Sequence, residues 1–581
     1  MMTEADRPRP ANGSVAKPLP PWAKFRSEML QSFPSPFRGA QDPLATGIYH
    51  AIRGLDLLKP QASGGPAYLG TDSPLRIDFA TVKSARLAPK METSAEIIKQ
   101  VINLFEGLPN WGHPLAMNNV MPQSNTAAIV ATILSEIFSP DIMENEYAWN
   151  IHRAELESGA MLADLAGWES QDAGCVYTYG GSGCWTYHLK YALTRVLPNS
   201  RNAGIRTDAK VICSQQAHYT MLNSTDWTGL GMDNIIRIRT DIETNGMDLV
   251  HLEEVLKDCQ GNGIPVASVV CTMGTTDANA FDPVEDVRVL MDRYPNLPPY
   301  GKALLYCDSV IGWAWLVFKN YDFVKNPLGF SQDVLPYLER NFNAIRGIFQ
   351  ADAFGADFHK TGFCPYISSA FVYRDAKEFE SLLSRGTQSY LQQRSPYNPM
   401  NYTLEVSRAA TGSLAGWATL KYFGQEGFQS VLGGVLENKV YLKNQIVRHQ
   451  DMVCVNASDY GFATLIRIYA QGIDAQAQYQ RELCDPNCRQ ELLEQNKLTE
   501  ALGNKLFEWF RSGKKIAERF TPYLGFTTGF RAVEYNRDLS DPLGVVCALK
   551  MFPLNVNITP ADMDHVLACI VAARDELMSA V

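Results

Sequence analysis

The sequence lacks three features, each of which would define a class of protein. No run of apolar residues approaches the roughly 18 that a membrane-spanning helix requires. No block of Lys and Arg resembles a nucleic-acid footprint, and the formal net charge of -10 argues against one. Cysteine is sparse, with 12 among 581 residues, which is too few for a disulfide scaffold. We therefore expect a globular chain with neither a membrane nor a nucleic acid as its partner.

Most of the cysteines lie in apolar runs such as VVCTMG and GVVCALKMF, which predicts buried, reduced thiols and a cytoplasmic protein. Cys484 and Cys488 form a separate pair in the segment CDPNC. A metal or redox role is one interpretation of this pair. However, no second Cys/His pair lies nearby in the sequence, and Asp-Pro-Asn is typical of a turn. We predict no metal site.

Composition suggests one large core with flanking pieces, since a chain of this length can bury a sizeable interior. The first residues are rich in Pro and polar side chains and lack the apolar core of a signal peptide. We predict a flexible tail over 1–23 and an N-terminal extension over 24–125 that packs on the core. A large domain is expected over 126–424 and a small α+β domain over 425–581.

The middle of the chain alternates strand-like and helix-like segments. Short runs rich in β-branched residues predict buried strands at 209–214, 266–273, 303–307 and 369–373. Helical spacing is found between them, at 248–258 and 283–293. This alternation predicts an α/β fold with a mainly parallel central sheet covered by helices.

The C-terminal part has a different pattern. A strand is predicted over 544–552 and a helix over 559–578. Thr559 can cap this helix, Pro560 suits its first turn, and Asp562 occupies the capping-box position. This pattern therefore predicts that the C-terminal part forms the small α+β domain.

Residues that can carry chemistry flank the predicted strands. Ligands bind beyond the carboxyl ends of the strands in an open parallel sheet. The residues at or beside these strand ends are His218, Thr276, Asp308, His359 and Lys360. In addition, a glycine-rich turn, Gly180–Gly183, lies at the N-terminus of a predicted helix. We expect all of them to converge on one crevice.

This set matches the needs of pyridoxal 5'-phosphate (PLP). The phosphate requires N–H donors at a helix N-terminus, which Gly181 and Ser182 can supply at close approach. The ring nitrogen requires a facing carboxylate, here Asp308, and the aldehyde requires a lysine amine, here Lys360. The flat ring accepts a stacked partner, here His218. Each feature alone has an ordinary structural interpretation, but their order and their placement at strand ends favour a PLP site.

On these motifs the chain resembles the group II PLP-dependent amino-acid decarboxylases, from about His113 to about Gly424. The most specific pieces are DFHK and CTMGTTDANAFDPV. The resemblance implies a fold-type-I PLP enzyme with a central sheet of the seven-stranded type and a smaller C-terminal domain. It also implies a homodimer in which the active site lies at the subunit interface, with 24–125 packing on the partner.

The resemblance also assigns roles. Lys360 would hold the cofactor covalently, with His359 beside it near the phosphate. Asp308 would pair with the ring nitrogen, His218 would stack on the ring, and Thr276 would contact the cofactor. The phosphate loop would contain Gly181 and Ser182.

A segment beginning SYLQQRSPYNPMNY resembles the family's mobile catalytic loop. Tyr390 falls where the family carries a tyrosine that protonates the substrate carbon after CO2 loss, and relatives with phenylalanine there form an aldehyde instead. A packing role for a loop aromatic is the alternative interpretation of Tyr390. With Lys360 and His218, it completes the predicted catalytic set.

Several positions depart from the family pattern. Val310 replaces a small alanine that touches the cofactor ring, which could shift the ring or narrow the pocket. Gly183 and Trp185 are unusual in the phosphate loop. An insert at about 320–350 is predicted to add a helix near the entrance.

The sequence thus predicts decarboxylation of an L-amino acid to its amine and CO2. The segment 110–119 and Trp185 suggest an aromatic substrate such as tyrosine, whereas Arg394 or Arg408 could serve an acidic one. The alternatives are another PLP reaction on the same scaffold (aldehyde synthase, lyase or aminotransferase) or a non-catalytic descendant. Retention of Lys360, Asp308 and His218 argues against the last.

Overall fold

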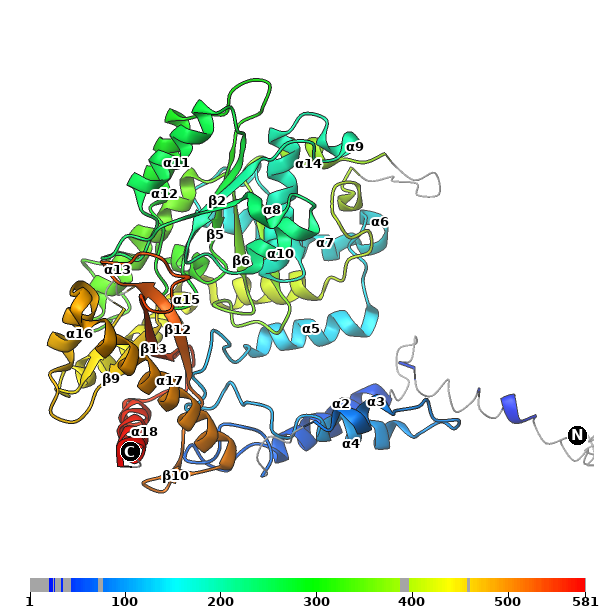
Figure 1. Cartoon of the computed structure of the whole chain (residues 1–581). Helices are drawn as coiled ribbons and strands as arrows, with labels where there is room; N and C mark the ends of the chain where they lie inside the picture. The colour runs from blue at the N-terminus through cyan, green and yellow to red at the C-terminus, as the bar shows by residue number, and fades with distance from the viewer. Residues whose placement is uncertain are drawn as a thin grey trace, which may run out of the picture. The chain divides into compact units, whose positions relative to one another are not determined.

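The computed structural model describes residues 20–23, 26, 33–34, 43–71, 77–386, 396–456 and 460–579 (Figure 1). The chain divides into two compact units. Met1–Lys59 and Leu69–Leu108 form one, and Pro60–Tyr68 and Pro109–Val581 form the other.

The first unit is built on helices. The described ones are α2 (Pro43–Leu57), α3 (Phe79–Lys83) and α4 (Ser94–Asn103). Gly54 of α2 lies against Ile102 of α4, whose Cδ1 is 2.4 Å from where a Cβ on that glycine would be. The two helices approach closely because α2 carries no side chain at this point.

A seven-stranded sheet forms the core of the second unit. Its order is β1 (Gly174–Thr178), β7 (Ser369–Tyr373), β6 (Ala353–Asp357), β5 (Leu304–Asp308), β4 (Val266–Thr272), β2 (Lys210–Ser214) and β3 (Ile235–Ile238). The strand β7 runs antiparallel to both of its neighbours, and the pairs from β6 to β3 are all parallel. The predicted α/β class and mainly parallel sheet are confirmed.

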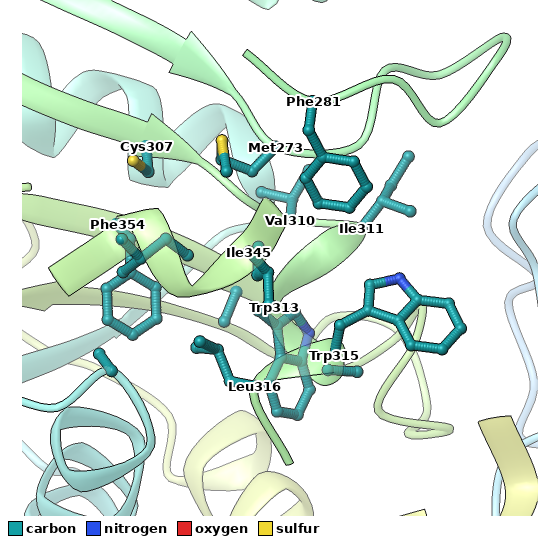
Figure 2. Packing of buried hydrophobic residues seen from close by; sticks show 14 of the residues in the cluster. Met273, Phe281, Cys307, Val310, Ile311, Trp313, Trp315, Leu316, Ile345 and Phe354 are labelled. Carbon is teal, nitrogen blue, oxygen red and sulfur yellow. The ribbon is translucent and has the colours of Figure 1, made fainter. Parts of the chain in front are cut away.

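Both faces of this sheet are buried, as expected for strands that are continuously apolar. Alternate residues enter two different cores. Val211 and Tyr306 pack with α8 (Gly181–Val196) on one face, whereas Ile212 and Cys307 join the larger core on the other. Figure 2 shows part of the larger core, in which Val310 and Trp313 follow β5. A tightly packed sheet of this kind can fix the loops at its edge.

Helices connect the strands and cover the sheet (Figure 1). The described ones up to residue 401 are α5 (Thr126–Phe138), α6 (Asn145–Ala148), η1 (Trp149–Ile151), α7 (His152–Leu165), α8, α9 (Ser200–Ala203), α10 (Thr220–Trp227), η2 (Met232–Asn234), α11 (Leu249–Gly261), α12 (Val284–Arg293), η3 (Gly312–Phe318), α13 (Leu335–Ile345), η4 (Arg346–Gln350), α14 (Ala376–Leu383) and η5 (Pro399–Asn401). The four strands and two helices predicted in this region are confirmed. The helix predicted in the insert is α13, which packs on η3 and η4, while its location near the entrance stays a prediction.

The C-terminal part holds a second, antiparallel sheet. Its order is β12 (Gly525–Ala532), β13 (Val545–Met551), β9 (Thr464–Ile468) and β8 (Met452–Cys454), with a separate pair of β10 (Lys515–Ile516) and β11 (Arg519–Phe520). Its helices are α15 (Thr411–Ile446), α16 (Ala475–Cys484), η6 (Pro486–Cys488), α17 (Arg489–Ser512) and α18 (Pro560–Ser579). The long helix α15 is interrupted at Gly424, where φ is 53°. This left-handed conformation suits glycine.

The predicted strand and helix at the C-terminus are β13 and α18. Asp562 accepts hydrogen bonds from the backbone N–H of Thr559 at 2.8 Å and from its hydroxyl at 2.6 Å. This is the arm of a capping box that reaches back to the start of the helix. The Asp562 arm of the expected capping box is therefore present, with the Thr559 hydroxyl as a donor to it.

Polar contacts join the C-terminal sheet to a loop of the central sheet. Lys550 of β13 pairs with Asp277 at 2.7 Å, and the hydroxyl of Thr527 donates to the same carboxylate at 2.8 Å. Asn279 accepts from the backbone N–H groups of Phe462 and Ala463. The loop that carries Thr276 is thus held to the C-terminal part at two positions, Asp277 and Asn279.

All twelve cysteines lie in the described part of the chain and none of them forms a disulfide there. Ten are buried, as predicted, and Cys484 is exposed. Across the described helices, none combines the length and the apolar character needed to cross a membrane.

Candidate active site

A cavity of about 360 Å³ opens at the carboxyl edge of the central sheet. Seven of the eight predicted site residues line it together: Lys360, Asp308, His218, His359, Thr276, Gly181 and Ser182. The eighth, Tyr390, lies outside the described residues, as does Arg394. Residues from five separate segments therefore meet in one place.

The first wall of the cavity is the start of α8. The helix begins at Gly181, and Gly180 ahead of it has a φ of 96°, which favours glycine. Gly183 is also required, because a Cβ there would lie 2.0 Å from the hydroxyl of Thr178. The departure from the family pattern at 183 thus has a packing reason. The N–H groups of a helix N-terminus beside this cavity can bind an anion such as a phosphate.

The second wall contains Lys360, which follows β6. Its Nζ lies 2.8 Å from Oδ2 of Asp357, the last residue of that strand. Oδ1 of Asp357 accepts from the hydroxyl of Ser369 at 2.6 Å, and Nε2 of His359 lies 3.5 Å from Oδ2. Burial is the largest single effect and acts to lower the pKa of Lys360, but the charge and hydrogen bond of Asp357, together with the charges of Asp308 and Tyr366, outweigh it and raise that pKa. The amine is held as an ammonium.

The third wall contains Asp308, the last residue of β5. Its Oδ2 accepts a hydrogen bond of 2.7 Å from the indole N–H of Trp185, whereas its buried Oδ1 has no hydrogen-bond partner among the described residues. Burial raises the pKa of Asp308, and the Trp185 hydrogen bond and the charge of Lys360 oppose that rise. One carboxylate oxygen is therefore left for a cationic partner in the cavity.

His218 lies beyond the end of β2. Its Nδ1 lies 2.7 Å from the hydroxyl of Thr220 and accepts from the backbone N–H of that residue at 3.2 Å. Burial lowers the pKa of His218, so the neutral ring is favoured. A fixed, neutral imidazole is suited to packing against a flat ring.

Val310 is accommodated by two glycines. Its Cγ1 lies 3.3 Å from where a Cβ would be on either Gly181 or Gly355. A Cβ on Gly355 would also meet the hydroxyl of Tyr306 at 2.5 Å. The larger side chain at 310 thus occupies space that the absent side chains leave, instead of closing the cavity.

The sequence did not identify every lining residue as part of the site, and three with polar or aromatic groups are Asp357, Trp185 and Tyr366. Asp357 stands three residues before Lys360 inside the DFHK motif, so its position was visible although its pairing was not. Trp185 was interpreted as a substrate-pocket wall. Tyr366 lines the cavity with its ring centroid 4.1 Å from that of His359, and no sequence signal marked it.

Other predicted contributors lie elsewhere. Arg408 is buried in an ion pair with Glu155 and donates to the carbonyl of Tyr177 at 3.2 Å. Trp111 packs near Tyr523, and Asn555 donates to the carbonyl of His113. The segment 110–119 therefore packs against the C-terminal part and contributes nothing to the described lining of this cavity.

The geometry fits PLP. The free Oδ1 of Asp308 meets the need of a protonated ring nitrogen, Lys360 supplies an amine, and the start of α8 supplies N–H donors for a phosphate. Within the described ranges, no group of three or more His, Cys, Asp or Glu is placed to hold a metal ion. An organic cofactor is the better match to this donor set.

Comparison with known proteins also points to PLP as the cofactor. Residues 82–300 match the family model described as the pyridoxal-dependent decarboxylase conserved domain. The acidic amino acid decarboxylase GADL1 of Xenopus tropicalis is 20% identical over 362 residues, which are 61% of this chain and 65% of that protein. The L-2,4-diaminobutyrate decarboxylase of Acinetobacter baumannii is 24% identical over 242 residues, 41% of each chain. The chain thus aligns with less than two thirds of the length of these relatives.

A solved structure extends the likeness of fold over nearly the whole chain. The crystal structure of Oryza sativa TDC with PLP and tryptamine has a TM-score of 0.73 and 15% identity, covering 94% of this chain and 100% of that one. At this identity the likeness concerns the fold.

Proposed function

Because this chain belongs to the family of pyridoxal-phosphate-dependent decarboxylases, we propose that it removes the α-carboxylate of an L-amino acid, giving the amine and CO2. The observation that carries the proposal is the convergence of Lys360, the free Oδ1 of Asp308 and the start of α8 on one cavity. These are the three anchoring groups that PLP requires.

Bound PLP would supply an electron-withdrawing ring that stabilises the electron pair left when the bond to CO2 breaks. Asp308 would stabilise a positive charge at the ring nitrogen through Oδ1. The N–H groups of Gly181 and Ser182 would hold the phosphate, Nζ of Lys360 would hold the aldehyde carbon, and His218 would pack against the ring. These residues bind and orient, which is the protein's main contribution to such a reaction.

The proton that replaces CO2 on the substrate carbon is proposed to come from Tyr390, on the basis of the resemblance. Once the product amine leaves, Nζ of Lys360 would hold the aldehyde carbon again. While Nζ is not bonded, the pair with Asp357 would favour its protonated form, so a proton has to leave Nζ before the bond can form again.

We propose an aromatic L-amino acid such as tyrosine as the substrate. Aromatic rings of Tyr219, Tyr366 and His359 line the cavity, and its described lining contains no arginine. An acidic substrate would need a cation for its second carboxylate; of the two arginines predicted for that role, Arg408 is already paired with Glu155 and Arg394 lies outside the described residues.

Release of CO2 from a panel of L-amino acids tests both the proposed reaction and the proposed substrate class. The panel contains tyrosine, tryptophan, aspartate and 2,4-diaminobutyrate, with the Lys360→Ala variant as the blank. We expect CO2 and amine in equal amounts from an aromatic member, without ammonia or hydrogen peroxide. CO2 together with an aldehyde, ammonia and hydrogen peroxide, formed with consumption of O2, would replace simple decarboxylation by decarboxylation-dependent aldehyde synthesis. Activity only on aspartate would support the proposed decarboxylation but would show that the proposed aromatic substrate is wrong.

We further propose that the working unit is a homodimer. Three large aromatic or apolar residues that line the cavity are exposed in the single chain, Tyr219 at 66%, Tyr366 at 56% and Ile367 at 52%. Trp227, 88% exposed, lines a neighbouring cavity of about 760 Å³ that shares Ser182 with the first. Exposed apolar groups that gather in this way are typical of a covered surface.

Sedimentation of the purified protein tests the dimer. We expect a mass close to twice 64.6 kDa, and a Trp227→Glu variant should shift the protein toward the monomer. A wild-type monomer at micromolar concentration would contradict the proposal.

A further inference from the structure

Trp185 connects the anion-binding helix to the strand that carries Asp308. It is the fifth residue of α8, and its side chain is 1% exposed. Its indole N–H donates to Oδ2 of Asp308 at 2.7 Å. The two residues are 123 positions apart in sequence, so the contact depends on the fold and not on a local motif.

The hydrogen bond makes the two carboxylate oxygens of Asp308 unequal. Oδ2 has a neutral donor at short distance, while the buried Oδ1 has no partner among the described residues. A buried, unsatisfied carboxylate oxygen is costly, and such a group marks a place where a ligand completes the site. The carboxylate cannot turn to use its other oxygen without losing the Trp185 bond.

Packing fixes the indole in this orientation. The ring of His188 meets it edge-on at 5.3 Å, and the ring of Tyr306 does so at 6.0 Å. These two rings are themselves stacked at 4.3 Å, and Nε2 of His188 lies 2.9 Å from the hydroxyl of Ser268. The donor is therefore set by the core of the sheet and not by a loop.

We propose that Trp185 is a positioning residue that holds Oδ2 of Asp308, so that Oδ1 is presented to the ring nitrogen of the cofactor. This rests on the proposed function, because it needs PLP as the ligand. A neutral donor on one oxygen also opposes the rise in the pKa of Asp308 that burial causes. Trp185 itself needs no contact with the ring nitrogen.

A pair of ligands isolates this effect without measuring activity. The first is PLP, and the second is its deaza analogue, in which a carbon replaces the ring nitrogen. Affinity of the apoprotein for each is measured by fluorescence titration. Trp185→Phe removes the N–H and keeps an aromatic ring. We expect it to weaken PLP binding by about tenfold or more, as for a lost charge-assisted hydrogen bond, and to change binding of the analogue by less than about twofold.

Trp168→Phe is the matched control. Trp168 is also buried, 4% exposed, and donates its N–H to the carbonyl of Phe349 at 3.1 Å, outside the described lining of the cavity. This variant should bind both ligands as the wild type does. If Trp185→Phe does not fold, the benzothiophene isostere of tryptophan, with sulfur in place of the N–H, provides the same comparison at position 185.

The outcomes distinguish the proposed role of Trp185 from the proposal that PLP is the cofactor. Equal losses for both ligands, or no loss for either, would show that Trp185 acts only in packing or not at all. Failure of the wild-type protein to bind PLP would overturn the cofactor proposal, and the role of Trp185 with it. A selective loss for PLP supports the positioning role.

Discussion

Lys360→Ala is expected to abolish covalent attachment of PLP and to reduce decarboxylation by at least about a thousandfold, the usual scale for loss of a covalent catalyst. Lys360 is the one lysine in the described lining of the cavity, so no neighbouring amine can replace it. The anchors at α8 and Asp308 remain, and the variant should still bind PLP non-covalently. Absorbance of the protein with PLP before and after gel filtration measures the attachment.

Lys325→Ala is the control for this experiment. Lys325 also forms an ion pair of 2.8 Å with an aspartate three residues earlier, but its side chain is 82% exposed. This variant should retain the absorbance and the activity of the wild type. If Lys360→Ala kept both after gel filtration, the assignment of the cofactor lysine would be wrong.

The position of Lys360 shows what the sequence could and could not reveal. The sequence placed this lysine ahead of the strand 369–373, and in a fully parallel sheet the start of that strand would lie at the edge opposite to Asp308. In the structure Lys360 lies at the same edge as Asp308 for two reasons. The strand β7 is antiparallel, and a strand that was not predicted, β6, ends at Asp357. The residues of β6, AFGAD, include no β-branched side chain and contain a glycine, so strand propensity gave no signal.

Site residues were predictable where they occur in a short motif at a strand end. Lys360, Asp308 and His218 met this condition, and they line the same cavity. The pairing of Trp185 with Asp308 was not predictable, because it joins a helix to a strand far away in sequence and depends on how α8 packs on the sheet. The space for Val310 likewise depends on Gly181 and Gly355, which approach it only in the folded chain.

Asp357→Asn is expected to change how the capture of PLP depends on pH. The amine of Lys360 must be neutral to bond to the aldehyde, so capture by the wild type accelerates as pH rises toward the raised pKa of that lysine. Burial remains in the variant and acts to lower this pKa, while the opposing charge of Asp357 is gone. The rate profile should therefore move to lower pH by at least about one unit, which means capture about tenfold faster at neutral pH.

Although Asp357→Asn is expected to speed the capture of PLP at neutral pH, it should lower the stability of the apoprotein. A raised pKa in the folded state means that the pair with Asp357 stabilises the fold at neutral pH, and that this contribution disappears as pH rises through the pKa of Lys360. Removal of one partner from such a pair costs about 3 kcal/mol. Urea unfolding at pH 7 should show this loss, and the difference from wild type should shrink at alkaline pH.

Asp322→Asn supplies the matched comparison, since Asp322 and Lys325 have the same spacing and the same 2.8 Å distance at an exposed site. Exposed pairs contribute little to stability because water screens them. That variant should capture PLP with the wild-type pH profile and unfold at the wild-type urea concentration. A profile for Asp357→Asn that coincides with wild type would show that Asp357 does not control the protonation of Lys360. A slower capture at every pH would instead assign Asp357 to orienting the amine, because the loss of a favourable position would then outweigh the gain in neutral lysine.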